Sequence, residues 1–332
     1  MKEEQTMSHE LADIKVEGND AEVDNFAAVI TAAVKYWGRD YDYDFIAGLS
    51  GSAFSPVWWM KESCAAWWTE FGNDTRIKFL GKALGFHVVE SPDVSDAEYA
   101  KTGVLPREME EFWDRAKEAV GEGKIVIMHT WPCWSIITEW NDDITKLGLA
   151  SVSGFGGTIC APYRSAKLYI LTPGPAELTR SEAFREALIF GADIADGAYE
   201  RPGFAYGGKL YDAILGKAAE KHFCGDCKDK SWSCVCRTMN RIEGANSTAA
   251  RFFDTASEFL GTQLPAPVVD AIKKGYQSVA EYAGAYTNCE ILKDNWNQEQ
   301  FRDEFYNRVT HMKLEHGKLS KPFRRLANTI SQ

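Results

Sequence analysis

The pattern of apolar residues changes near Thr179, and this change constrains the fold more than any other feature. Before it, three segments have the composition of strands: KIVIMHTW, CWSIITEW and AKLYILTP. After it, apolar residues recur at helical spacing over 183–195, 207–220, 245–260, 268–286 and 298–316. Thr179 and Glu182 have capping-box spacing, which predicts a helix start at the change. The sequence therefore predicts an α+β protein with a small, mostly antiparallel sheet followed by a helical region.

The first half also contains helix patterns. Residues 24–37 and 106–120 each place apolar residues on one helical face. Residues 75–84 form a shorter pattern that Gly85 ends, and a strand is expected to begin at 86–89. Between the helix patterns, the aromatic and glycine-punctuated stretch 41–68 is expected to be a packed loop. The acidic first 20 residues are expected to be flexible.

Charge and hydropathy exclude some classes of function. The 332 residues carry a net charge of −11, so there is no basic field to attract nucleic acid or an anionic membrane. No apolar stretch reaches the roughly 20 residues of a membrane span, and MKEEQTMSHE lacks the basic and apolar parts of a signal peptide. We therefore expect a cytoplasmic protein whose eight cysteines lie in a reducing compartment.

The order of segments in the first half resembles a known family. A helix ends at Tyr36-Trp37-Gly38, and AGLSGSAF, a second helix, a strand and CWSIITEW follow. This order is similar to the butirosin biosynthesis protein H N-terminal domain family, a branch of the papain-like fold shared with bacteriocin-leader cysteine peptidases. FREALIFGADIADGAYERPGFAYGGKLYDAILGKA is similar to the helical continuation of such proteins. The resemblance implies a papain-like domain over about residues 20–175, and a helical region over 176–332.

The same resemblance makes demands on two catalytic positions. In the peptidase branch a cysteine opens the first helix, where the helix dipole lowers the pKa of its thiol. Counting back from Tyr36 and Gly38 places Asn25 there, or a near neighbour in Asp24-Asn25-Phe26, and none of these is a cysteine. The matching histidine would open the central strand, but Pro132-Cys133-Trp134-Ser135 occupies that place. Since neither group of the dyad is present, we expect a non-peptidase.

A cysteine cluster is the sharpest chemical motif. HFCGDCKDKSWSCVC carries a C-x2-C pair, six residues, and a C-x-C pair. Four thiolates suit zinc or an iron–sulfur cluster, although the spacer is shorter than that between common zinc knuckles. A disulfide or redox pair, or four unconnected thiols, remain open alternatives. The predicted metal ligands are Cys224, Cys227, Cys234 and Cys236.

The leading functional hypothesis is a binding protein that holds a small molecule or a peptide in an aromatic cleft. The expected lining residues are Asn25, Ser50, Gly51, Phe54, Trp58, Trp131 and Trp134. The rival is an acyl- or amide-transfer enzyme, as the resemblance implies, with Cys64 or Cys133 as a displaced nucleophile and His129 as a candidate base. A Cys133–His129 pair is not favoured, because residues four apart in one strand lie about 13 Å apart. A third hypothesis is a thiol- or metal-handling protein centred on the cysteine cluster.

Overall fold

The computed structural model describes residues 11, 13–18, 24–54, 58–59, 76–94, 99, 101–130, 133–140, 146–152, 156–160, 166–219, 231–260 and 264–330. By its internal contacts the chain divides into two compact units. The sheet unit comprises residues 1–20, 28–41 and 77–177, and the helical unit comprises 21–27, 42–76 and 178–332. The predicted boundary near residue 175 lies close to the division at 177/178. Residues 42–76, however, belong to the helical unit.

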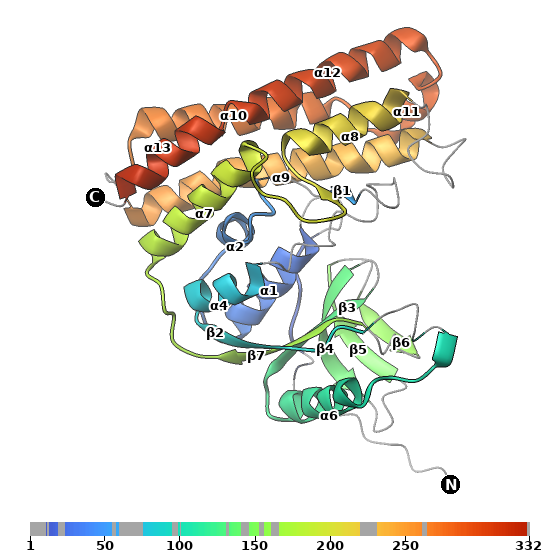
Figure 1. Cartoon of the computed structure of the whole chain (residues 1–332), viewed down its shortest axis with the longest axis vertical. Helices are drawn as coiled ribbons and strands as arrows, with labels where there is room; N and C mark the ends of the chain where they lie inside the picture. Colours follow the sequence, from blue (N-terminus) through green and yellow to red (C-terminus); the bar gives the residue numbers. More distant parts are fainter. Residues whose placement is uncertain are drawn as a thin grey trace. The chain divides into compact units, whose positions relative to one another are not determined.

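The sheet unit is built on a six-stranded antiparallel sheet (Figure 1). The strand order is β2-β7-β3-β4-β5-β6. The strands are β2 (Phe86–Glu90), β3 (Ile125–Thr130), β4 (Cys133–Trp140), β5 (Lys146–Ala150), β6 (Gly157–Cys160) and β7 (Leu168–Pro173). The predicted α+β class and small antiparallel sheet are confirmed. Strands β5 and β6 were not predicted from the sequence.

Three helices belong wholly or mainly to this unit: α1 (Asn25–Tyr36), α4 (Ile77–Leu84) and α6 (Arg107–Gly121). In Figure 1, α6 lies on the other side of the sheet from α1 and α4. Helix α6 buries the apolar face that its sequence predicts, including Met109, Phe112 and Trp113. Just beyond α1, Trp37 packs against Phe86 of β2, with ring centroids 5.9 Å apart. Apolar helix faces therefore cover the sheet as the spacing predicts.

The N-terminal stretch is only partly described. Leu11 is fully buried and Ile14 is 6% exposed, and the Ile14 amide donates to the Leu11 carbonyl at 3.1 Å. These two residues are therefore packed, which differs from the flexible tail expected over residues 1–20.

The described helices of the helical unit are α2 (Tyr43–Ser50), α7 (Arg180–Ala195), α8 (Gly208–Ala219), α9 (Ser231–Leu260), α10 (Ala266–Gly284), α11 (Cys289–Asn295), α12 (Glu299–Gly317) and α13 (Ser320–Ile330). Helices α8, α9, α10 and α12 lie side by side (Figure 1). A two-stranded pairing joins β1 (Trp58–Trp59) to β8 (Phe204–Ala205). The Thr179–Glu182 capping box is present at the start of α7. The predicted helical region is confirmed.

Helix α2 overturns the packed loop expected over 41–68, for residues 43–50. The Asp42 side chain accepts from the Phe45 amide at 2.7 Å and caps the helix. Gly51, with φ +87°, ends it. Gly48 faces Phe252 of α9 so closely that a Cβ would collide with the ring. The glycines thus serve close helix packing rather than a loop.

None of the helices in the described part of the chain combines the length and apolar character that a membrane crossing needs.

Candidate functional site

Asn25, the residue expected at the nucleophile position, opens α1 and is fully buried. The Asp24 carboxylate accepts a hydrogen bond from the Ala27 amide at 2.8 Å. The Asp24 amide donates to the Tyr43 hydroxyl at 2.6 Å. A carboxylate thus already occupies this helix N-terminus. It favours the neutral form of any thiol placed there, the reverse of what a cysteine peptidase needs.

The displaced pair, Cys133 and His129, is not brought together. His129 and Cys133 lie on two antiparallel strands, because the chain reverses between β3 and β4. The distance between them therefore does not follow from the rise per residue along one strand. In the hairpin His129 lies opposite Trp134, and Cys133 lies opposite Thr130. Since cross-strand partners share a face and neighbours alternate, His129 and Cys133 point to opposite faces. Cys133 is 1% exposed. The two side chains therefore do not form a nucleophile–base pair with each other.

The predicted lining of the aromatic cleft divides between the two units. Phe54 and Trp58 are core residues of the helical unit, 0% and 1% exposed. The Ser50 hydroxyl donates to the Ala47 carbonyl at 2.9 Å. Gly51 faces Phe190, whose ring would collide with a Cβ there. These side chains pack against protein where an open cleft was expected.

Trp134 is the remaining described member of that predicted lining, and it belongs to the sheet unit. Its ring packs between His129 and Tyr169, with centroids 5.0 Å and 5.6 Å away. It is 3% exposed, so it too is a packed residue. Cys64 and Trp131 lie outside the described residues.

The four-thiolate site is wrong for Cys236, which forms a disulfide with Cys289 of α11. Cys234 and Cys236 both lie on α9. In an α-helix, residues at positions i and i+2 are rotated by about 200° around the axis, so their side chains point in nearly opposite directions. They cannot chelate one ion together. Cys234 is a buried thiol, and Cys224 and Cys227 lie outside the described residues. In the ranges that the structure describes, no group of three or more His, Cys, Asp or Glu is placed to hold a metal.

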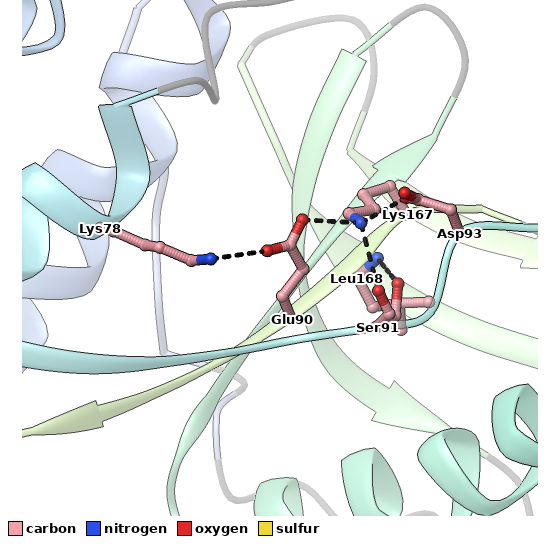
Figure 2. Close-up of polar contacts among 6 residues, drawn as sticks. All are labelled: Lys78, Glu90, Ser91, Asp93, Lys167 and Leu168. Atoms are coloured by element: carbon pink, nitrogen blue, oxygen red, sulfur yellow. Dashed lines mark hydrogen bonds and ion pairs between the residues drawn. The ribbon is translucent and has the colours of Figure 1, made fainter.

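A network of charged side chains lies at the β2–β7 edge of the sheet (Figure 2). The Lys167 ammonium contacts Glu90 at 2.8 Å, Asp93 at 2.7 Å and the Ser91 carbonyl at 3.1 Å. Lys78 of α4 contacts the other Glu90 oxygen at 3.3 Å. The three donors of Lys167 are therefore all engaged by acceptors within the protein.

The pKa shifts of this network agree with a structural role. Partial burial acts to lower the pKa of Lys167, but its bonds to Asp93 and Glu90 outweigh burial and raise it. Partial burial likewise acts to raise the pKa of Glu90, but Lys167 and Lys78 lower it. A lysine nucleophile needs the opposite shift. The network holds the strand edge and supplies no reactive amine.

A groove between α10 and α13 combines an apolar surface with two positive charges. It has a volume of about 370 Å³, within the range of ligand sites. Its apolar surface comes from Pro265, Pro267, Val268, Ala271 and Pro322. Lys321 and Arg325 of α13 add two positive charges.

The two cations of this groove differ from several others in the described part of the chain. Lys167, Arg251, Lys313 and Arg324 each pair with a carboxylate. Lys321 and Arg325 have no acidic partner among the described residues. A negatively charged group is therefore the complement that they lack. The sequence did not indicate this site, because its residues come from two segments at least 50 positions apart and residues 320–330 were not predicted to be a helix.

Comparison with protein-family models and with curated proteins found no match for this chain. The function must therefore be argued from the residues themselves.

Proposed function

We propose that the protein is a non-peptidase binding protein that holds a small amphipathic anion in the α10–α13 groove. The carboxylate or sulfonate of such a ligand would contact Lys321 and Arg325, and its apolar part would cover Pro265, Val268 and Pro322. The observation that carries this proposal is the pair of cations without acidic partners beside an apolar surface. Arginine suits this role because its guanidinium can hold a carboxylate through two parallel hydrogen bonds.

The negative net charge of the chain makes anion binding a selective sign of a local site. A chain of net charge −11 repels small anions in general. Anion binding that survives moderate salt therefore requires a local site. The function remains the one expected from the sequence, a binding protein, but the ligand is assigned to the α10–α13 groove and not to the aromatic segment.

The papain-like ancestry remains part of the proposal for the N-terminal region. It is supported by the start of α1 at Asn25 and by the start of β4 at Cys133. Acyl or amide transfer by Cys133 with His129 is not favoured, because Cys133 is buried and His129 faces the other side of the sheet. The other candidate nucleophile, Cys64, lies outside the described residues.

The test is a fluorescence titration with 1-anilinonaphthalene-8-sulfonate, an amphipathic anion, and with the uncharged N-phenyl-1-naphthylamine. The Lys321→Gln/Arg325→Gln variant should bind the anion at least about tenfold more weakly, since a hydrogen bond to a charged group contributes about 1.5–3 kcal/mol. The matched control is Lys274→Gln/Lys293→Gln, which removes two exposed cations outside the groove. Its affinity should stay within about twofold of wild type, within the small effect of exposed charges.

Two results contradict the proposal. One is equal weakening in the groove variant and the control. The other is equal affinity of wild type for the charged and uncharged probes. Circular dichroism of each variant shows whether it is folded, since unfolded surface also binds these dyes.

A further inference from the structure

Four polar side chains meet inside the helical unit, each from a different helix. They lie on α8, α9, α10 and α12, which pack against one another (Figure 1). All four residues are at most 1% exposed. We call them the buried polar cluster: Tyr211, Asn246, Tyr276 and His316.

The members of the cluster are neighbours. The ring of His316 lies 5.8 Å from that of Tyr211 and 6.2 Å from that of Tyr276, between centroids. Burial raises the pKa of Tyr211, and the side chain of Asn246 offsets part of this rise. Burial also raises the pKa of Tyr276, and nearby Tyr211 adds to that rise. The four polar groups therefore share one region of the core.

Each member has one buried polar atom that meets no partner among the described residues at ordinary hydrogen-bond distance and angle, although Asn246 approaches Tyr211 closely enough to lower the pKa of its hydroxyl. These atoms are the Tyr211 and Tyr276 hydroxyl oxygens, Asn246 Oδ1 and His316 Nδ1. Buried polar atoms without a partner are rare in native proteins, and each costs about 1–3 kcal/mol. Four of them in one place indicate a bound polar molecule.

The protonation states of the cluster follow from its other contacts. His316 Nε2 lies 2.7 Å from the Phe54 carbonyl, which can only accept, so Nε2 carries the proton. Burial lowers the pKa of His316 and keeps the ring neutral, which leaves Nδ1 as an acceptor. The Asn246 amide nitrogen donates to the Ile242 carbonyl at 2.6 Å, so Oδ1 is an acceptor as well. Both tyrosines keep their protons and can donate.

We propose that the buried polar cluster is a binding site for internal water. A water molecule, or a hydrogen-bonded pair, donates to His316 Nδ1 and Asn246 Oδ1 and accepts from the hydroxyls of Tyr211 and Tyr276. Two acceptors and two donors match the hydrogen-bonding capacity of water, and buried waters make about three such bonds. The four helices are then joined through one solvent site. This inference is independent of the groove.

The composition of the cluster argues against other occupants. It contains no carboxylate or thiolate to neutralise a metal cation, and no positive charge to neutralise an anion. A neutral hydrogen-bonding molecule is the class that remains, and water is the smallest member of it.

The test is to count long-lived internal waters by oxygen-17 magnetic relaxation dispersion in the full chain. The Tyr211→Phe/Tyr276→Phe variant should lose about one or two such waters, because it removes both donors while keeping the rings. Tyr286→Phe, a matched change on another buried tyrosine, should leave the count unchanged. An unchanged count in the double variant overturns the proposal.

A crystal structure of the wild-type protein gives a second reading that does not depend on a variant that folds. Water density within hydrogen-bond distance of at least three of the four atoms supports the site. Direct hydrogen bonds among the four side chains, with no density between them, overturn it.

Discussion

His316 Nε2 lies 2.7 Å from the carbonyl oxygen of Phe54, a residue 262 positions earlier in the chain. This contact joins the turn after α2 to α12 inside the helical unit. Phe54 also packs on Tyr276 and Phe323, with ring centroids 6.3 Å and 5.2 Å away. The imidazole is therefore a polar link at the centre of an aromatic core, and its charge state matters for folding.

Stability should fall on mild acidification because of His316. Burial lowers its folded-state pKa below the ordinary value of 6.5, and the bond to Phe54 offsets this only in part. The unfolded chain therefore binds the proton more readily. Stability is fully present above about pH 6.5 and is lost as the pH falls from there toward the folded-state pKa, by at most about 1.4 kcal/mol per pH unit. Urea denaturation between about pH 5.5 and 7.5 measures this slope.

The His316→Gln variant should lose the slope, because an amide can still donate to Phe54 but does not titrate in this range. His311→Gln, on the exposed side of the same helix, is the control and should keep it. A wild-type stability that is flat across this range would contradict the assignment.

The Cys236–Cys289 disulfide should contribute substantially to stability. It closes a loop with a sequence separation of 53 residues, for which the chain-entropy estimate is about 4 kcal/mol. Reduction, or the Cys236→Ala/Cys289→Ala variant, should lower the free energy of unfolding by about 2–4 kcal/mol. Guanidinium denaturation with and without reductant measures the change, and the variant should not respond to reductant.

Peptide mapping of alkylated protein tests the pairing itself. A Cys236–Cys289 cross-linked peptide is expected. Stoichiometric zinc with Cys236 reduced would overturn the pairing and restore the metal hypothesis.

A persistent disulfide also argues against the cytoplasmic placement expected from the sequence, because cytosolic thiols are normally kept reduced.

Lys167→Met should destabilise the sheet unit by about 1–2 kcal/mol, since it leaves two carboxylates without their shared cation. The Lys167 side chain is 22% exposed, and its ammonium contacts both Glu90 and Asp93. Lys82→Met is the matched control, because its contact to Glu177 is 3.9 Å long and exposed on both sides. Urea denaturation at low and high salt should show a clear loss for Lys167→Met and almost none for the control. Equal effects would show that the network adds nothing beyond an ordinary surface pair.

Local patterns predicted much of the fold. The helix expected over 24–37 is α1 (Asn25–Tyr36), and CWSIITEW is β4 from end to end. The Thr179 capping box forms because both partners lie within one turn. Strand β5 was not predicted because it is only five residues long and contains Gly148. The glycine is explained by packing, since a Cβ at this position would lie too close to the Glu139 side chain.

The candidate sites were less predictable, because each depends on a distant partner. The cysteine spacing indicated a local cluster, but Cys236 pairs with a residue that stood alone in the sequence. The register between β3 and β4 separates Cys133 from His129, and no local pattern reveals it. His316 carried no motif, although its surroundings make it the most constrained histidine described.

Two glycine substitutions should change stability in opposite directions. Gly48→Ala places a Cβ against the Phe252 ring, and overpacking of this kind costs about 1–3 kcal/mol. Gly216→Ala, at an exposed position of α8, meets no atom within 4 Å and should stabilise by about 0.5–1 kcal/mol through the backbone entropy of the unfolded chain. Thermal denaturation should therefore lower the midpoint for the first variant and raise it for the second.

The Phe252→Leu change tests whether Gly48→Ala acts through contact with the Phe252 ring or through helix propensity. Combined with Gly48→Ala, it should cost less than the sum of the two single changes, because leucine leaves room for the new methyl group. Strict additivity would show that the close approach of α2 to α9 does not limit residue 48.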